Sequence, residues 1–410
     1  MLSLKEKQTL RELAKRYAEI SALPIQNERI TRARDINDLK PCRPVVWVDE
    51  IPWHEMDIDD KLKLTTEDEF ARQMEQFFRE KLYRWEYIQA DTVLEPFFPI
   101  YKSYEAGSMG IEVQEQQLST DTRNHIVSHS YIDQLDTMEK VEALKEPRVT
   151  ADSAMDTQRF EWASDVLDGI LPVKLKGHYY YHAPWDQIPR YRGVMPVLMD
   201  LTDNPELLHA TVKKLSDFGL SIMKQMEALK LVDSEVTSLH CTPGYVSGLA
   251  PKEGNPKLKN MWFRTMAQMF TDISPAMHEE FDILYSKPLA EECGLTYYGC
   301  CEALDNKIEL IKKHYPNLRK IGVPTKANPE VCAEQIRGDY VYAHKPNPAF
   351  VAGTFEPDTV RKEIARVIET CQKNGCAFEF VLKDISTVSY KPQNLIDWVQ
   401  TVMGTVDGYY

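Results

Sequence analysis

The sequence predicts an α/β protein, a (β/α)8 TIM barrel preceded by an N-terminal helical extension. From about residue 171 to the C-terminus, strand-like segments alternate strictly with amphipathic helices, and the connections between them are short. Such alternation implies a parallel sheet, and the number of units favours a closed barrel over an open doubly wound sheet. No Gly-x-Gly-x-x-Gly follows any strand, which argues against dinucleotide binding. We therefore expect a helical extension over residues 1–90 and the barrel over residues 91–410.

The composition excludes several classes of protein. The chain has 410 residues with 49 Lys plus Arg against 63 Asp plus Glu, a net charge of −14, which argues against nucleic acid or an anionic membrane as the partner. No stretch approaches the roughly 18 apolar residues of a membrane span, and residues 1–7 lack the apolar core of a signal peptide. Eight cysteines are too few for a disulfide scaffold. We expect a soluble, cytoplasmic protein.

The first half of the chain begins with charged residues of helical period over about 1–35. A short apolar strand is expected at 43–48, and a long amphipathic helix at 66–87. Residues 94–165 mix short strands with polar loops. A strand-like segment at 171–181 then leads to Trp185-Asp186, and Asn204-Pro205 opens another helix.

In the second half, each unit is a strand followed by a helix. The expected strands are 235–240, 295–299, 318–323, 340–343 and 377–382, and the expected helices are 274–292, 304–314, 329–336, 358–373 and 392–403. Residues 242–273 interrupt this alternation. We interpret them as an insertion, either a lid over a substrate or a solvated decoration.

Chemically reactive side chains follow several of these strands. In a barrel the residues just beyond each strand meet at one mouth, where active sites lie. The groups expected there are Trp185-Asp186, His240-Cys241, Cys300-Cys301-Glu302, His344-Lys345 and Lys383-Asp384. Each also has a structural interpretation: Cys300 as a packed thiol, for example, or Lys383 as the ion-pair partner of Asp384. His278, on a helix, is expected to be solvated or to cap the helix.

Thiolate, imidazole and carboxylate are the ligands that zinc accepts, and a catalytic zinc needs three of them and an open position. Cys301, His240 and Glu302 are the candidate zinc ligands. A lysine at a barrel mouth, such as Lys383, can act as an acid or hold an anionic group.

Once these segments are placed in order, the chain resembles the uroporphyrinogen decarboxylase-like superfamily, and more closely its zinc- and corrinoid-dependent methyltransferases. The resemblance spans about residues 43–410 and is carried by short motifs in a common order: 105–110, Trp185-Asp186 with Arg192-Gly193, 203–206, 274–281, 298–302, 345–348 and 383–388. It implies zinc held by a His-x-Cys and by a Cys after the last strand. Cys301 matches the first cysteine, whereas Gly299 stands at the histidine and Lys383-Asp384 follows the last strand.

The resemblance implies transfer of a methyl group from a small O- or N-methylated substrate to a corrinoid carried by a partner protein. The residues that we expect to take part are Glu302, His240, Lys383 and Asp186 in catalysis and Trp185, Tyr298, His344 and Lys345 in substrate binding. Two alternatives stay open: a cofactor-free decarboxylase of a carboxylated substrate, and a non-catalytic small-molecule-binding barrel. A homodimer is one assembly compatible with the sequence.

Overall fold

The computed structural model describes residues 3–119 and 127–410, and its centre is a parallel sheet of seven strands. Neighbouring strands follow the order β1-β15-β14-β13-β12-β11-β8, and every pair is parallel. The strands are β1 (Val45–Val48), β8 (Tyr180–His182), β11 (Trp262–Thr265), β12 (Leu295–Tyr298), β13 (Leu318–Pro324), β14 (Val341–Lys345) and β15 (Ala377–Leu382). The expected α/β class and parallel sheet are confirmed.

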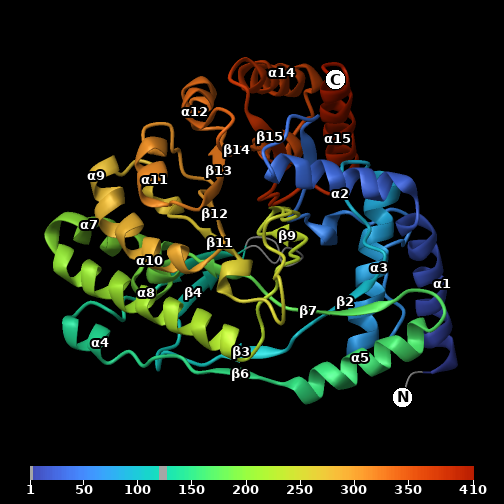
Figure 1. Ribbon diagram of the computed structural model, residues 1–410, viewed down its shortest axis with the longest axis horizontal. Helices are drawn as coiled ribbons and strands as arrows, with labels where there is room; N and C mark the ends of the chain where they lie inside the picture. Colours follow the sequence, from blue (N-terminus) through green and yellow to red (C-terminus); the bar gives the residue numbers. More distant parts are fainter. Residues whose placement is uncertain (1–2, 120–126) are drawn as a thin grey trace.

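The C-terminal helices cover the outer face of this sheet (Figure 1). They are α11 (Ile308–His314), α12 (Pro329–Ile336), α14 (Pro357–Lys373) and α15 (Pro392–Asp407), with the short α13 (Ala349–Ala352) between them. Local signals set their starts: the Asn328 side chain accepts hydrogen bonds from the Glu330 and Val331 amides, and proline follows it at the first helical position. Both α12 and β15 have the bounds that the sequence predicts.

The N-terminal segment is helical, as its period predicts, and it also supplies a sheet strand. Its helices are α1 (Leu4–Ser21), α2 (Pro24–Asn37) and α3 (Glu69–Tyr87). A capping box between Ser3 and Glu6 starts α1. Tyr17 and Phe78 pack in one cluster between α1 and α3. Because β1 pairs with β15, residues 1–90 contribute to the central sheet as well as to the helical layer.

The segment between β1 and β8 forms small peripheral pairs. These are β2 (Phe98–Tyr101) with β7 (Val173–Lys176), β3 (Tyr104–Ala106) with β6 (Val149–Ala151), and β4 (Glu115–Leu118) with β5 (Ser128–Tyr131), accompanied by α4 (Met138–Glu142) and α5 (Ser153–Leu167). The strand expected at 171–181 is split into β7 and β8. The break falls at Gly177, where a Cβ would lie 2.5 Å from the Leu231 carbonyl oxygen, so only glycine allows this approach.

The helices before and after β11 cover the other part of the sheet. They are α6 (Pro184–Arg192), α7 (Val194–Asp203), α8 (Pro205–Ala228), α9 (Pro275–His278) and α10 (Leu284–Glu292). The helix expected at 274–292 is present, but a π-helical turn over Glu279–Ile283 interrupts it. Among the described residues, no helix has both the length and the apolar character that crossing a bilayer requires.

Two predictions about the middle of the chain were wrong. Residues 242–273 are not an insertion, because they contain β11, a strand of the central sheet between β8 and β12. The expected strand at 235–240 instead forms one arm of a hairpin, β9 (Ser238–Leu239) with β10 (Thr242–Pro243). The strand β11 was missed because it is short and the charged Arg264 stands inside its apolar run, although all four of its residues are buried.

The hairpin β9-β10 packs against the inner face of the sheet, on the side opposite the helices (Figure 1). Leu239 shares a buried cluster with Trp262 and Tyr297. Beneath it, the Lys320 ammonium donates to the Thr242 hydroxyl at 3.0 Å and pairs with the Glu379 carboxylate at 2.8 Å. The hairpin is thereby fixed with its turn at the carboxyl-terminal edge of the sheet.

Candidate functional site

The turn of the hairpin presents His240 and Cys241 at the carboxyl-terminal edge of the sheet. Leu239 pairs directly with Thr242, so these two residues form the whole turn, with φ values of 21° and 73°. Two-residue hairpin turns that need positive φ usually contain Asn-Gly, because other side chains are strained there. Such strain concentrates at functional sites. The turn is therefore the first indication that this edge of the sheet carries the site.

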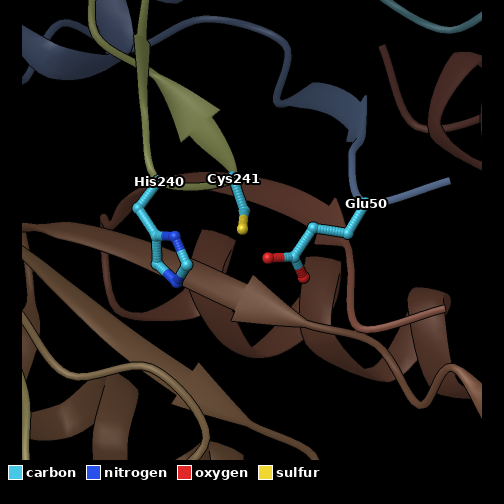
Figure 2. Close-up of side chains that lie close together, drawn as sticks. All are labelled: Glu50, His240 and Cys241. Atoms are coloured by element: carbon cyan, nitrogen blue, oxygen red, sulfur yellow. The ribbon is translucent and has the colours of Figure 1, made fainter. Parts of the chain in front are cut away.

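Glu50, His240 and Cys241 form a compact group. One ligand atom from each lies within 4.8 Å of the other two. Figure 2 shows the Glu50 carboxylate extending toward the Cys241 sulfur, with the His240 ring beside them. Cys241 is buried, His240 is half-buried and Glu50 is exposed, so the group opens to solvent on the glutamate side. Burial raises the pKa of the Cys241 thiol.

The backbone and aromatic neighbours hold this group in place. The Asp384 amide donates to Glu50 Oε2 at 2.9 Å. The His240 amide donates to the Tyr179 hydroxyl at 2.7 Å, and the His240 ring stacks on Tyr181 with 4.9 Å between ring centroids. Glu50 follows β1 and Asp384 follows β15, so paired strands set their separation.

Cys300 and Cys301 lie beside the same edge, after β12. The Cys301 thiol lies 3.9 Å from the Cys300 sulfur and donates to Asp384 Oδ2 at 3.0 Å. Contact with the Cys301 thiol, and then with His240 and the cations Arg264 and Lys383, lowers the pKa of Cys300 well below its usual value. Cys300 is therefore the thiol of this pair that ionises more readily.

Lys383 is a buried cation at the end of β15. Its ammonium lies 2.8 Å from Asp384 Oδ2 and 4.0 Å from Glu50 Oε2. Burial alone would lower the pKa of Lys383, but the neighbouring Cys300 and Cys301 outweigh burial and raise it. Lys383 therefore stays charged and can hold an anionic group.

Two further cations, Arg264 and Lys345, are buried on the inner face of the sheet around Tyr297. The Arg264 guanidinium carbon lies 3.9 Å from the Tyr297 ring centroid, and the Lys345 ammonium lies 5.5 Å from it. In residues 3–119 and 127–410, no carboxylate forms an ion pair with either cation, whereas Lys320 is paired with Glu379. Burial alone would lower the pKa of both cations, but the neighbouring Tyr297 and Cys300 outweigh burial and raise it, without supplying a carboxylate partner. Both cations are therefore suited to an anionic ligand.

Asp186, in the first turn of α6, faces the same region. Its Oδ2 accepts hydrogen bonds from the Tyr181 hydroxyl at 3.2 Å and from the Gln268 side-chain Nε2 at 3.1 Å. Burial raises the pKa of Asp186, which favours its protonated form. The neighbouring Trp185 packs into the core against Phe270, with 4.5 Å between ring centroids.

The carboxylate of Glu302 is fully buried, and both of its oxygens accept hydrogen bonds from the backbone. One oxygen accepts from the Ala267 amide at 3.0 Å and the other from the Cys300 amide at 2.8 Å. Glu302 thus joins the loops that follow β11 and β12. The structure brings His240, Cys301, Lys383, Lys345 and Asp186 to one edge of the sheet, with Glu302 holding the loops beneath them.

Tyr298 and His344 lie on the outer face of the sheet, toward the helices. The Tyr298 hydroxyl donates to Asp282 Oδ2 at 2.6 Å, and the His344 ring lies 3.3 Å from Glu363 of α14. The side chains next to them along each strand, Tyr297 and Lys345, face the inner side. The prediction that His278 is solvated or capping was wrong: it is fully buried, 2.5 Å from the Tyr298 hydroxyl.

Sequence reasoning missed Glu50, Cys241 and Arg264 as members of the site. Glu50 stands two residues after β1, at the strand-end position that drew attention to the other candidates. Cys241 was noted beside His240 but not assigned a role. The signal for Arg264 was its place inside the apolar run Trp262–Thr265, which indicates a buried cation.

Comparisons with known proteins show a likeness in fold. No family model and no curated protein matches this chain. A solved structure, a methyltransferase from Methanosarcina mazei, superimposes with a TM-score of 0.51 over 93% of this chain and 99% of that one, at 9% sequence identity. At this identity the match establishes that the two chains share an architecture over nearly their whole lengths.

Proposed function

We propose that this protein is a cytoplasmic methyltransferase of the uroporphyrinogen decarboxylase-like type, built on a (β/α)8 barrel. It would remove a methyl group from a small O- or N-methylated substrate and transfer it to a corrinoid carried by a partner protein. The near full-length likeness to a methyltransferase supports the proposal. The observation that carries it is the gathering of three buried cations, Arg264, Lys345 and Lys383, at one edge of the sheet together with Asp186, whose pKa is raised by burial.

Closure of the sheet into a barrel is part of this proposal. The eighth position would lie between β1 and β8, the two ends of the strand order. On the β1 side, the Asp91 amide donates to the Val46 carbonyl at 2.9 Å. On the β8 side, His178 forms an isolated parallel bridge with Val232. The chain after Asp91 runs into β2, and the parallel partner of β2 is β7, the strand that leads into β8, so this pair supports closure of the ring.

Methyl transfer requires the protein to stabilise the leaving group, which is the substrate oxygen that loses its methyl group. When the bond between oxygen and the methyl carbon breaks, its electron pair stays on oxygen, and the methyl group goes to the corrinoid nucleophile. Cations fixed in a low-dielectric site stabilise the negative charge that develops on that oxygen. Burial raises the pKa of Asp186, which favours its role as the acid that donates a proton to this oxygen. In this mechanism Lys383 holds the substrate close to Asp186.

A methyl-transfer assay tests this function. The purified protein is incubated with a panel of methylated donors and a reduced corrinoid protein, and methylcobalt formation is followed by absorbance. We expect transfer from at least one donor, and Asp186→Asn to lower kcat by about 10²-fold or more. Asp358→Asn, an exposed carboxylate on α14, is the matched control. Absence of methylcobalt with every donor, from protein shown to be folded, would overturn the proposal.

A decarboxylase is the second candidate, because Arg264 and Lys345 lack carboxylate partners among the described residues and would suit a carboxylated substrate. The measurement that separates the two is carbon dioxide release from carboxylated compounds by protein stripped of metal. Ligand binding that survives Lys383→Met unchanged, with no turnover of any kind, would instead favour a binding protein.

A further inference from the structure

We propose that Glu50, His240 and Cys241 hold a zinc ion whose fourth position is open to the substrate. The three ligand atoms already lie within 4.8 Å of one another. In a tetrahedral site with bonds of about 2.0–2.3 Å, ligand atoms are about 3.6 Å apart. Closing that difference takes movements of about an ångström, which side-chain rotation can supply. Figure 2 shows the three side chains already directed toward a common point.

The donor set selects the metal. An imidazole, a thiolate and a carboxylate together suit zinc, whereas calcium and magnesium require oxygen ligands. Three protein ligands leave one position for substrate or water, as in catalytic zinc sites. The gradient from buried Cys241 to exposed Glu50 places that open position on the accessible side of the group.

The backbone holds these ligands at a cost to stability. All three residues have positive φ: 48° at Glu50, 21° at His240 and 73° at Cys241. Glycine or asparagine would adopt these conformations more easily, and each strained residue costs about 1–3 kcal/mol. These three strained positions hold a carboxylate, an imidazole and a thiol instead, and each of these groups can bind a metal ion.

Neighbouring groups orient the ligands from below and from the side. Thr242, next to Cys241, is held by Lys320 and Glu379 inside the sheet. The Asp384 amide binds Oε2 of Glu50 and directs the carboxylate. Stacking on Tyr181 fixes the plane of the His240 ring. Oriented ligands bind metals more tightly, because less ordering is required on binding.

The ligands expected from the sequence, Cys301 and Glu302, are engaged elsewhere. Both Glu302 oxygens accept backbone amides, and the Cys301 thiol donates to Asp384. Of that expected set, His240 alone belongs to the group proposed here. A catalytic role for the ion, withdrawing charge from the substrate oxygen, rests on the proposed function. Metal binding itself rests on the ligand geometry.

Metal analysis of the full-length protein tests the site without any methyl donor. After zinc loading and dialysis, we expect one zinc per chain. Cys241→Ser, His240→Ala and Glu50→Gln should each lower zinc affinity at least tenfold. Cys293→Ser, a buried thiol outside the group, is the matched control for Cys241→Ser and should keep the metal.

Cobalt substitution identifies the sulfur ligand directly. Co²⁺ bound to a thiolate gives a charge-transfer absorption band, which we expect to disappear in Cys241→Ser and to persist in Cys301→Ser. Circular dichroism confirms that each variant is folded. The double variant H240N/C241G, suited to this turn, provides a second folded protein without the ligands.

Two results would overturn the zinc proposal: no bound zinc or cobalt in the folded protein, or a band lost in Cys301→Ser and kept in Cys241→Ser. Failure of methyl transfer with the metal site intact would count against the proposed function alone. Loss of metal binding with methyl transfer intact would count against the site alone.

Discussion

His182 is a buried histidine of β8 that points away from the site. It is 5% exposed, and its Nε2 lies 3.3 Å from the Ser216 hydroxyl. Burial disfavours the charged ring and lowers the pKa of His182 to about 4. Between pH 6.5 and 4, the unfolded chain therefore binds a proton at this residue that the folded chain does not bind.

We predict that His182 makes the protein less stable as the pH falls from 6.5 to 4. The free energy of unfolding should decrease by up to about 3 kcal/mol from this residue, because each pKa unit corresponds to about 1.4 kcal/mol. Urea unfolding at pH 7 and pH 4.5 measures the change. His182→Gln should flatten this part of the profile, and an unchanged slope would contradict the assignment.

Asp186 leads to a prediction about the pH dependence of activity. A general acid must be protonated, and burial raises the pKa of Asp186 above its usual value. Therefore kcat should fall as the pH rises through this raised pKa. In Asp186→Asn the residual activity should lack this limb. A profile in which wild type and variant lose activity in parallel would assign the limb to another group.

At the scale of the element, the turn of hairpin β9-β10 is destabilised by the backbone strain at His240 and Cys241. The variant H240N/C241G replaces two strained residues by the pair that this turn favours. We predict that it raises the free energy of unfolding of the metal-free protein by about 1–3 kcal/mol. Denaturant unfolding measures this change, and Cys241→Ser, which leaves the backbone strain in place, should show no gain.

The same hairpin depends on a buried ion pair beneath it. Glu379→Gln would leave Lys320 buried without its counter-ion, and we predict a loss of about 3–5 kcal/mol in the free energy of unfolding. The exposed pair Lys213 and Asp217 on α8 is the control. Asp217→Asn should change stability by less than about 1 kcal/mol. If Glu379→Gln and Asp217→Asn lowered the free energy of unfolding by similar amounts, breaking the buried ion pair would cost no more than breaking an exposed one, contrary to this prediction.

At the scale of the whole molecule, Glu55 joins the N-terminal segment to the loop after β15. Its buried carboxylate accepts the Thr387 hydroxyl at 2.7 Å, the Val388 amide at 2.7 Å and the Tyr390 amide at 3.2 Å. The strand β1, the site residue Glu50 and the end of β15 therefore share one anchor. This explains how two ends of the chain hold a common site.

We predict that Glu55→Ala lowers the free energy of unfolding by about 2–4 kcal/mol, because three donors lose a charged acceptor. Hydrogen exchange at the Val388 amide should accelerate in the folded variant. Glu253→Ala, in an exposed loop, should leave both measurements unchanged. Unchanged exchange at Val388 would show that Glu55 does not anchor this loop.

How far the sequence predicts this molecule depends on how local each signal is. The bounds of α12 and β15 were predicted correctly, because a cap, a proline and an apolar run lie within the segments themselves. β11 was missed because its buried cation resembles a surface residue in the sequence. Tyr298 and His344 were predicted to bind the substrate, but both face the outer side of the sheet. Their neighbours along the strands, Tyr297 and Lys345, face the inner side. Adjacent strand residues face opposite sides, so a shift of one residue reverses the direction of the side chain.

The sequence by itself determined the α/β class, the parallel sheet and the edge at which reactive groups collect. The periodicity of hydrophobic residues and the positions of strand ends depend on residues close together in the sequence, so they can be predicted from it. Only the tertiary structure decided that Glu50 lies beside His240 and Cys241, and that Glu302 binds backbone amides instead. Those contacts depend on strand order and on the docking of the β9-β10 hairpin inside the sheet, which are set by packing between segments far apart in the chain.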